Sequence, residues 1–484
     1  MKKAAISLLL LALMLPYVAT PFCGFYVAKA DAKLFNKSSQ VIYVRNGIHS
    51  TITMANDYEG PLEDFAMVVP VPVVLREHEI RIAKSDLFEK FDSYSAPRLA
   101  VYYDENPCAR YIYENEDSFS NLKSTAVADF AYSANAEKEY KVTIEAQYEV
   151  GEYDILILSA KESDGLERWL TDNGYKIPDQ AKEVLTPYIR DNMKFFVAKV
   201  SADRMELKNS KFLSPIQINF PSERFMLPIR LGMANANGDQ DMIVYMLTEN
   251  GRVEAANYRN TKIPSNQNIP LFVRDNFSSF YKKLFDKHYQ ENQTAVHLEY
   301  SWDISSSNYV KCDPCNSTPP SAQELINAGV NWLQPQRNNW GGSDYQGNIH
   351  FTRLHVRYNR ANFPQDLVFT QTSNKQNYQG RYVLHQPAQI NSDCEQLNDY
   401  YLMVTDRRYD ELANYKALTG ESLSAHLNYV KEYESKLDAR TKRNDLMPII
   451  FDIKNGFPLL IFLVSIITFI SFSIFQNRQK QNID

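Results

Sequence analysis

The sequence predicts a β-rich α+β protein with antiparallel sheets and hairpins, several amphipathic helices and a single C-terminal transmembrane helix. Three observations support this fold class. Tyr and Phe are abundant (31 and 26 copies) while Gly is scarce (16 copies), and such a composition favours strands. Asn-Gly pairs at Asn46, Asn237 and Asn250 lie between strand-like runs. An uncharged apolar run occupies Phe457–Phe475.

The N-terminal segment has the features of an export signal. Two lysines precede an apolar run from Ala4 to Leu15, as in a cleavable signal peptide. Small residues place the expected cleavage near Thr20, and cleavage after Ala30 is the alternative. The other interpretation is an uncleaved anchor, but the run is short for a spanning helix, which needs about 20 apolar residues. We therefore predict a signal peptide over residues 1–20.

Several segments alternate between apolar and polar residues, as half-buried strands do. The segments Tyr140–Val150 ("YKVTIEAQYEV") and Arg353–Tyr358 ("RLHVRY") show this alternation. The three Asn-Gly pairs are expected to form type I′ turns, because both central residues of that turn need positive φ. Together these signals predict antiparallel hairpins.

The run Ala66–Leu75 ("AMVVPVPVVL") contains Pro70 and Pro72 two residues apart. Because proline cannot donate a hydrogen bond to a neighbouring strand, we expect an edge strand or a polyproline II segment here. The functional interpretation is a rigid docking edge for a partner peptide. The interpretation we favour is an edge that proline blocks against aggregation.

Fewer helices than strands are predicted, from cap residues and apolar spacing. They are expected to begin at Ser163, near Val273, after Ser321 and at Asp406. The second carries an aromatic stripe, which we interpret as part of the core, and follows a linker over residues 261–270. Ser321 and Glu324 form a capping box. The last helical region continues to Lys442 with a break at Gly420 and is expected to lead into the membrane.

The apolar run Phe457–Phe475 has the length of a membrane-spanning helix of about 20 residues. It lacks the polar stripe of a buried helix in a soluble domain. Basic residues flank the run on both sides, so the charge rule alone does not fix its orientation. The signal peptide does, because it places the body of the protein outside the cytoplasm. We expect a cell-membrane protein with one spanning helix, in the periplasm or at the cell surface.

These features divide the chain linearly. The expected parts are a signal peptide (1–20), a β-rich extracytoplasmic domain (21–262), a second α+β region with a C-x-x-C loop (263–400), a helical membrane-proximal stalk (401–455), a transmembrane helix (456–476) and a cytoplasmic tail (477–484). The length between the terminal segments suits two domains.

Charge and motifs exclude several function classes. The net charge of −6 and the isoelectric point near 5.9 are unlike those of a nucleic-acid-binding protein. The sequence contains no G-x-S-x-G, H-E-x-x-H, G-x-x-x-x-G-K-[ST] or G-x-G-x-x-G motif. Two S-x-x-K matches, at Ser120 and Ser279, are expected by chance. We therefore predict no catalytic, cofactor-binding or metal-binding residue, no cofactor and no nucleic-acid partner.

The cysteines are candidates for disulfides, because an exported chain meets an oxidising environment. They are Cys23, Cys108, Cys312, Cys315 and Cys394. Cys312 and Cys315 have C-x-x-C spacing, but they precede the helix in a proline-containing loop, which argues against a redox couple at a helix N-terminus. We expect a structural disulfide within this loop or from it to Cys394, with Cys23 and Cys108 as a second pair. The alternative is a zinc site completed by Cys394 and a histidine such as His385.

Seven strings of the sequence are specific enough to compare with known families. They are "FCGFYVAKADAKLFNKSSQV", "MANDYEGPLEDFAMVVPVP", "SAPRL", "DENPC", "VGEYDILILSAKESDGLERWL", "CDPC" and "LHVRYNR". Together they resemble domain-of-unknown-function family 2330, a group of exported bacterial proteins, over residues 23–381. The resemblance implies a signal peptide, an extracytoplasmic body and a C-terminal anchor, and it transfers no catalytic residue. The Pro-Thr cleavage region departs from the tidier A-x-A pattern.

We therefore expect a membrane-anchored extracytoplasmic protein that binds or scaffolds a partner protein in the cell envelope. One alternative is an exported, hydrolase-like enzyme whose site is assembled from distant residues. Another is a metal-dependent module built on Cys312 and Cys315. A cleft with perturbed carboxylates or histidines would favour the enzyme. An exposed apolar or aromatic patch, or an open sheet edge, would favour the binding module.

Overall fold

The computed structural model describes most of the chain between the two terminal segments. It covers residues 25–28, 35–36, 39–55, 58–59, 65–109, 142–173, 181–201, 203–204, 213–235, 238–305, 318–336 and 344–452. The expected signal peptide and transmembrane helix lie outside the described residues, as do Cys23, Cys312 and Cys315. Within the described part, no helix is both long and apolar enough to cross a membrane.

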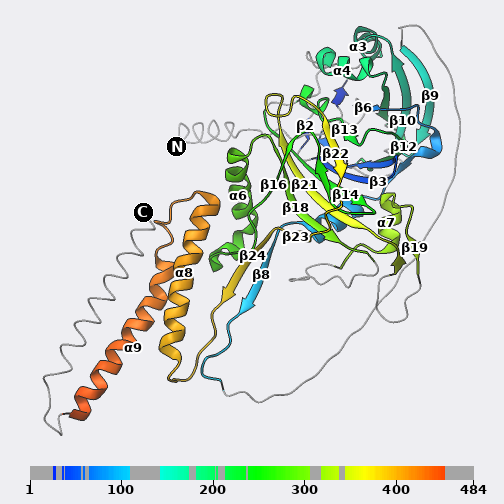
Figure 1. Cartoon of the computed structure of the whole chain (residues 1–484). Coiled ribbons are helices and arrows are strands. Elements are labelled where there is room, and N and C mark those ends of the chain that lie inside the picture. Colours follow the sequence, from blue (N-terminus) through cyan, green and yellow to red (C-terminus); the bar gives the residue numbers. More distant parts are fainter. Residues whose placement is uncertain are drawn as a thin grey trace, which may run out of the picture. The chain divides into compact units, whose positions relative to one another are not determined.

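The chain forms two compact units that interleave along the sequence (Figure 1). The sandwich unit comprises residues 1–96, 120–263 and 292–379, and the helical unit comprises residues 97–119, 264–291 and 380–484. Each unit is thus assembled from three separate segments, whereas each domain predicted from the sequence is one continuous segment. The fold class is mixed α+β and strand-rich, as predicted.

The first sheet of the sandwich unit is fully antiparallel. Its five strands follow the order β1 (Phe25–Ala28), β6 (Phe65–Val71), β11 (Lys194–Val200), β10 (Tyr153–Ala160) and β9 (Val142–Val150). β9 confirms the strand predicted from alternation. The two faces of β6 are both apolar, since Met67 and Val69 enter one core cluster while Ala66 and Val68 enter another. Such a strand requires cover on both faces.

The second sheet has nine strands. Their order is β16 (Arg259–Lys262), β18 (Ala295–Asp303), β21 (His350–Tyr358), β14 (Gln240–Thr248), β3 (Ser39–Asn46), β4 (His49–Met54), β12 (Ile216–Pro221) and β7 (Ile80–Ile82), with β23 (Tyr378–Gln379) also paired to β18. Two pairs, β14 with β3 and β16 with β18, are parallel. The sheet is therefore mixed, which corrects the expectation of purely antiparallel sheets.

Four layers make up the sandwich unit. The two sheets pack face to face around the largest core cluster, which includes Val69, Ile155 and Val244. Helices cover the two outer faces: α3 (Ser163–Asp172) and α4 (Ala181–Arg190) pack on the first sheet, and α2 (Asp86–Ser95) and α7 (Ala322–Ala328) pack on the second. The order of layers is helix, sheet, sheet, helix, with apolar clusters between successive layers.

One of the three predicted hairpins is present. Gly47, at φ +56°, joins β3 to β4. Asn237 lies outside the described residues. The hairpins expected before and after β14 are nevertheless wrong, because β14 pairs with β3 and β21 rather than with a neighbour in sequence. Asn-Gly supplies the positive φ that many tight turns need, but it does not select the strands that pair. Pairing here follows from burial of β14 on both faces.

The proline-containing run is not an edge strand. β6 lies between β1 and β11, so that expectation is wrong for the strand as a whole. However, β1 pairs only with Phe65–Val68, and Pro70 lies beyond the end of that pairing. Pro72 follows the end of the strand. The prolines therefore lie at positions where β6 forms no hydrogen bonds with β1, so their lack of an N–H group is tolerated on that side.

The predicted helices are confirmed, with shifted boundaries in places. α3 begins at Ser163, but its N-cap is Glu162 rather than Ser163. Ser321 and Glu324 form the expected capping box at α7. The aromatic stripe lies on η4 (Leu271–Asn276) and α6 (Phe277–Glu291), where Phe280 and Leu284 are buried.

The helical unit combines a small parallel sheet with three long helices (Figure 1). The sheet order is β17 (Gln267–Asn268), β24 (Arg381–Gln386), β8 (Arg98–Tyr103). α8 (Leu397–Thr419) ends at Gly420, whose φ is +75°, and α9 (Asn428–Asp452) follows. These two helices confirm the predicted helical region and its break at Gly420, but the region begins at Leu397 rather than Asp406 and extends to Asp452 rather than Lys442.

The remaining elements are short. They are β2 (Phe35–Asn36), β5 (Tyr58–Glu59), η2 (Glu77–Glu79), β13 (Met226–Leu227), η3 (Gly232–Asn235), β15 (Val253–Ala255), β19 (Gln334–Pro335), β20 (Tyr345–Gln346) and β22 (Leu367–Gln371). β22 pairs with both β13 and β15, and the other strands form two-stranded pieces. All of them belong to the sandwich unit.

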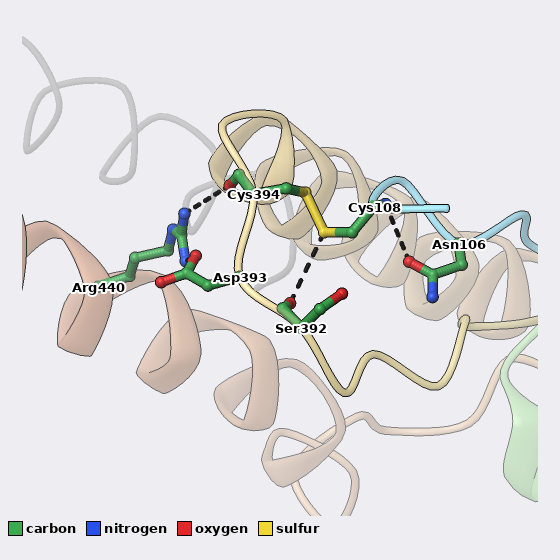
Figure 2. The surroundings of a disulfide bond; sticks show 6 residues. All are labelled: Asn106, Cys108, Ser392, Asp393, Cys394 and Arg440. Atoms are coloured by element: carbon green, nitrogen blue, oxygen red, sulfur yellow. Dashed lines mark hydrogen bonds and ion pairs between the residues drawn. A yellow bond between two sulfur atoms is a disulfide. The ribbon is translucent and has the colours of Figure 1, made fainter. Parts of the chain in front are cut away.

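A disulfide joins Cys108 to Cys394 within the helical unit (Figure 2). The Cα atoms are 5.6 Å apart, and 286 positions separate the two residues in sequence. The expected pairing of Cys23 with Cys108 is therefore wrong, and Cys394 pairs with neither cysteine of the C-x-x-C loop. Sequence spacing could not reveal this pair, because the fold alone brings β8 beside the start of α8. Arg440 of α9 donates a hydrogen bond to the Cys394 carbonyl at 2.7 Å.

Non-reducing digestion of the full chain is expected to release one peptide that links Cys108 to Cys394. Replacing both cysteines by serine should lower the free energy of unfolding of the helical unit by about 2–5 kcal/mol, since the cross-link restricts the unfolded chain. Denaturant unfolding followed by hydrogen exchange would measure this loss. The nearby exposed Ser392, changed to alanine, is the control and should have little effect. A linked Cys23–Cys108 peptide would contradict the assignment.

Candidate functional site

Charged side chains line the outer face of β21. Leu354, Val356 and Tyr358 point into the core between the sheets, and Arg353, His355 and Arg357 alternate with them. The predicted alternation is thus confirmed. The polar face is not a solvated one, however, because the Arg353 side chain is only 7% exposed and that of His355 only 12% exposed.

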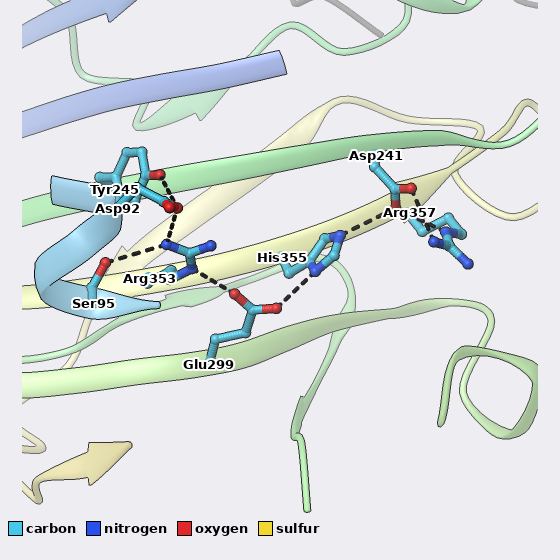
Figure 3. Close-up of polar contacts among 8 residues, drawn as sticks. All are labelled: Asp92, Ser95, Asp241, Tyr245, Glu299, Arg353, His355 and Arg357. Atoms are coloured by element: carbon cyan, nitrogen blue, oxygen red, sulfur yellow. Dashed lines mark hydrogen bonds and ion pairs between the residues drawn. The ribbon is translucent and has the colours of Figure 1, made fainter. Parts of the chain in front are cut away.

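At one end of this charged row, several contacts centre on Arg353 (Figure 3). Its Nη1 donates to Asp92 Oδ1 of α2 at 2.6 Å, and its Nε donates to Glu299 Oε2 of β18 at 2.5 Å. Tyr245 of β14 donates its hydroxyl to the same Asp92 oxygen at 2.9 Å. The guanidinium therefore ties α2 to two strands of the sheet.

Towards the other end of the row, the contacts centre on His355 (Figure 3). Its Nδ1 lies 2.7 Å from Glu299 Oε1, and its Nε2 lies 3.1 Å from Asp241 Oδ1. Arg357 Nε donates to that same Asp241 oxygen at 2.8 Å. Because both imidazole nitrogens face carboxylates, both can donate only if the ring is protonated.

A β-bulge supplies the central carboxylate. Leu298 pairs with Leu354 and Tyr300 pairs with Arg353, so Glu299 is the extra residue in β18. The bulge lets Glu299 and Tyr300 both reach the outer face, where Tyr300 packs in the core cluster under α2. Bulges commonly redirect a side chain in this way. Glu299 can therefore bridge Arg353 and His355.

The carboxylates shift the titration of this row. Burial alone would lower the pKa of His355, but Glu299 and Asp241 outweigh it and raise that pKa. Burial would raise the pKa of Asp241, yet hydrogen bonds and charge from His355 and Arg357 hold it well below its usual range. The row is thus a chain of alternating charges that stabilise one another. Its charged groups are all paired with other residues of the protein, and none of them lines the cavity or the depression described below.

A second polar cluster has the spacing of a nucleophile and a base. Ser301 Oγ lies 2.8 Å from His350 Nε2, and Arg252 Nε donates to the same Oγ at 3.0 Å. Burial lowers the pKa of His350 to about 4, so its ring is neutral. However, Ser301 and His350 are 0% and 1% exposed. A substrate cannot reach a hydroxyl at that depth, so the pair serves as an internal hydrogen-bond network.

An apolar cavity of about 280 Å³ opens between the two sheets of the sandwich unit. Its walls come from β4 and β12 on one side and from the end of β6 on the other, with Ile52, Ile218 and Val69 as examples. Pro70 and Pro72 of the proline-containing run also line it. Apolar cavities with a few polar groups at one end are typical of small-molecule sites.

The mouth of this cavity carries its charged groups. Arg224 Nη1 lies 2.5 Å from Asp191 Oδ2, and both side chains are partly exposed. Ser222 and Glu223 belong to the same rim. Because the ion pair neutralises itself and is exposed, it adds little to stability. The cavity thus combines an apolar interior with a wet, polar entrance.

Most residues singled out from the sequence do not meet in a site. Cys394 is part of a disulfide, so it cannot complete a zinc site with the C-x-x-C loop. His385 lies on β24, and burial followed by the charge of Arg407 lowers its pKa. Among the residues that the structure describes, no group of His, Cys, Asp and Glu could hold a metal ion. The only early signal of the cavity is the pair of prolines at 70 and 72.

The pH dependence of stability should report the charged row. Because the pKa of His355 is raised in the folded protein, its charge contributes fully to stability at pH values below its ordinary pKa of 6.5. This contribution is lost as the pH rises through the pKa of the folded state. Asp241 has a lowered pKa, so its contribution is present above its ordinary value of 3.8 and is lost as pH falls. Both contributions are complete between these two values.

His355→Gln is therefore expected to lower the free energy of unfolding more at about pH 5.5 than at about pH 9, with a difference of about 1–2 kcal/mol. Urea unfolding of the full chain at the two pH values would measure it. The exposed His78, changed to glutamine, is the control and should alter stability little at either pH. An equal loss from His355→Gln at both pH values would show that the imidazolium is not stabilising.

Comparisons with known proteins give one family and one weak structural likeness. No curated protein is significantly similar to the chain. A crystal structure of a mutated baculovirus P35 after caspase cleavage is 8% identical, with 69% of this chain and 99% of that chain covered. Its TM-score of 0.27 is too low to support any argument about fold or function. A family model described as "Uncharacterized protein conserved in bacteria (DUF2330)" matches residues 17–370. This match spans most of the chain and confirms the resemblance found in the sequence, so the chain belongs to the DUF2330 family of bacterial proteins.

Proposed function

We propose that this protein is a membrane-anchored, extracytoplasmic binding module of the cell envelope, and that the cavity between the two sheets is its ligand site. The observation that carries the proposal is the apolar cavity itself, with its charged groups confined to the rim. Domain interiors are otherwise close-packed, and voids larger than a water molecule are few. A cavity of about 280 Å³ is therefore a distinctive feature of this core.

The cavity fits a small, uncharged, apolar molecule. Its interior is lined by Ile, Met, Val, Leu, Phe and Pro side chains, which offer dispersion contacts and no hydrogen-bond donor. The rim pair of Arg224 and Asp191 has no net charge, so it can receive a hydroxyl or a similar polar end. The volume lies just below the range of about 300–1,000 Å³ found for ligand pockets, so only a small molecule fits. A short alkyl chain with a polar end meets these requirements.

The terminal segments support the membrane-anchored part of the proposal. Ala4–Leu15 has the form of a signal peptide, and Phe457–Phe475 has the length of a spanning helix. Cleavage near Thr20 retains β1 in the mature protein, whereas cleavage after Ala30 would remove it. Because β1 pairs with β6 along four residues, its loss would expose the edge of the first sheet. Cleavage near Thr20 is therefore the proposed processing site.

Filling the cavity should abolish binding without unfolding the protein. Val73→Trp places an indole into the cavity, while Val74→Trp, one residue further on, points away from it because Val74 is exposed and does not line the cavity. The full chain in lipid nanodiscs is expected to transfer NMR saturation to 1-hexanol in the wild type and in Val74→Trp, but not in Val73→Trp. The unfolding free energy of Val73→Trp should stay within about 1 kcal/mol of the wild type. Equal signals from both variants would refute the site.

The tether is tested by processing and release. Mass spectrometry of the mature protein is expected to find an N-terminus near Pro21, and removal of residues 456–484 should release the body into the extracytoplasmic fraction. The matched control removes only the tail after residue 476, which leaves the apolar run and should leave the protein in the membrane. An N-terminus at Asp31, or a body that stays membrane-bound without the run, would contradict this part of the proposal.

A further inference from the structure

The outer strand of the helical unit has an open, apolar edge. Among the described strands, β8 pairs with β24 alone. Val101 and Tyr103, which share one face of β8, are 37% and 73% exposed. The strand, "RLAVYY", carries no proline or lysine, the residues that usually protect such an edge from pairing with another chain. This edge can accept an added strand.

The end of this strand is held rigidly. The Asp104 N–H donates to the Gln386 carbonyl at 2.9 Å, which extends the pairing of β8 with β24. The Asp104 carboxylate accepts two hydrogen bonds from Arg407 at 2.8 and 2.6 Å and one from Tyr400 at 2.8 Å. The disulfide at Cys108 follows four residues later. A strand fixed in this way loses little entropy when a partner binds.

An acidic face of α8 adjoins the strand. A shallow depression on this helix is lined by Asp399, Leu402, Met403, Asp406, Arg407 and Asp410. Leu402 and Met403 are 40% and 47% exposed, which is unusual for large apolar side chains on one helical stripe. Arg407 is the only cation in the lining, and its guanidinium is already paired with Asp104.

Arg407 also connects the end of the strand to the depression. It lines the depression on α8 and binds Asp104, the residue directly after Tyr103. The surface is therefore apolar at Val101, Tyr103, Leu402 and Met403 and negatively charged along the row of aspartates. Burial and the neighbouring Asp410 raise the pKa of Asp406.

We propose that this surface, the edge of β8 with the acidic face of α8, binds an extended segment of a partner protein in which apolar and basic residues alternate. The segment would add to β8 through main-chain hydrogen bonds. Its apolar side chains would lie on the face of Val101 and Tyr103 and cover them. Lysines or arginines at its ends, beyond the paired residues, would reach Asp406 and Asp410. Charge complementarity of this kind selects the partner and its orientation. The inference is independent of the ligand cavity, which lies in the other unit.

Three synthetic peptides test the proposal on the full chain in nanodiscs of phosphatidylcholine, a lipid without net charge. They are acetyl-KVKVKVK-amide, its glutamate counterpart acetyl-EVEVEVE-amide, and acetyl-KVKPKVK-amide, in which proline removes a main-chain donor. Fluorescence anisotropy of labelled peptides should show that the first binds and that the other two bind at least about tenfold more weakly. Hydrogen exchange should slow within residues 98–103 when the first peptide binds, since an added strand protects the edge amides.

Substitutions then locate the binding surface. The double variant Asp406→Lys with Asp410→Lys, and separately Tyr103→Lys, should each weaken binding of the first peptide about tenfold or more. The control is Val368→Lys, at a position in the sandwich unit that is 40% exposed, and it should bind as the wild type does. Because the altered side chains are exposed, thermal unfolding should be unchanged.

Three outcomes would overturn the proposal. The first is equal binding of all three peptides, and the second is unchanged binding by the charge-reversal variant. The third is self-association of the full chain that Tyr103→Lys abolishes and the peptide does not compete with, which would assign the surface to a second copy of the chain. Binding limited to the first peptide, with protection of β8, would support it.

Discussion

The structure depends on one constraint, which is that each sheet of the sandwich unit has a strand that is apolar on both faces. β6 and β14 each contribute alternate residues to two different core clusters. Neither sheet can therefore face water, so each packs against the other and under a pair of helices. The positions of α2 and α7, and with them the burial of Arg353, follow from this requirement. The charged row on β21 is buried because α2 must cover the sheet, and it is tolerated because Glu299 and Asp92 pair its arginine.

The cavity is the place where this packing is incomplete. It lies where β6 runs past the end of β1, and Pro70 and Pro72 help to line it. A proline ring is short and rigid, so it cannot reach across the gap between sheets as a longer side chain could. Atoms around such a void lose dispersion contacts that a close-packed core would keep. A bound apolar molecule would restore those contacts, which is the physical reason for treating the cavity as a site rather than as a packing defect.

The sequence predicted which segments form strands and helices better than it predicted which residues pair. Alternation identified β9 and β21, and cap residues identified α7, because both signals are local. The alternation in "RLHVRY" predicted a half-buried strand, yet its polar face is a buried ion-pair row. Its partners Glu299 and Asp241 come from strands far apart in sequence, and Glu299 reaches the row only through a bulge. The cysteine pairing failed for the same reason, since Cys108 and Cys394 are brought together by the parallel pairing of β8 with β24.

That disulfide also bears on where the protein resides. It closes the helical unit between the first and the last of its three segments, so it spans most of the chain. In the chain-entropy account, a cross-link that closes a longer loop removes more freedom from the unfolded chain, although the gain grows only slowly with length. Such a bond persists in an oxidising compartment and is rare in a reducing cytosol. The pair is therefore compatible with the proposed extracytoplasmic location. It also anchors the end of β8, the strand whose edge is proposed to bind a partner. The same disulfide is thus relevant to the proposed location and to the proposed binding surface.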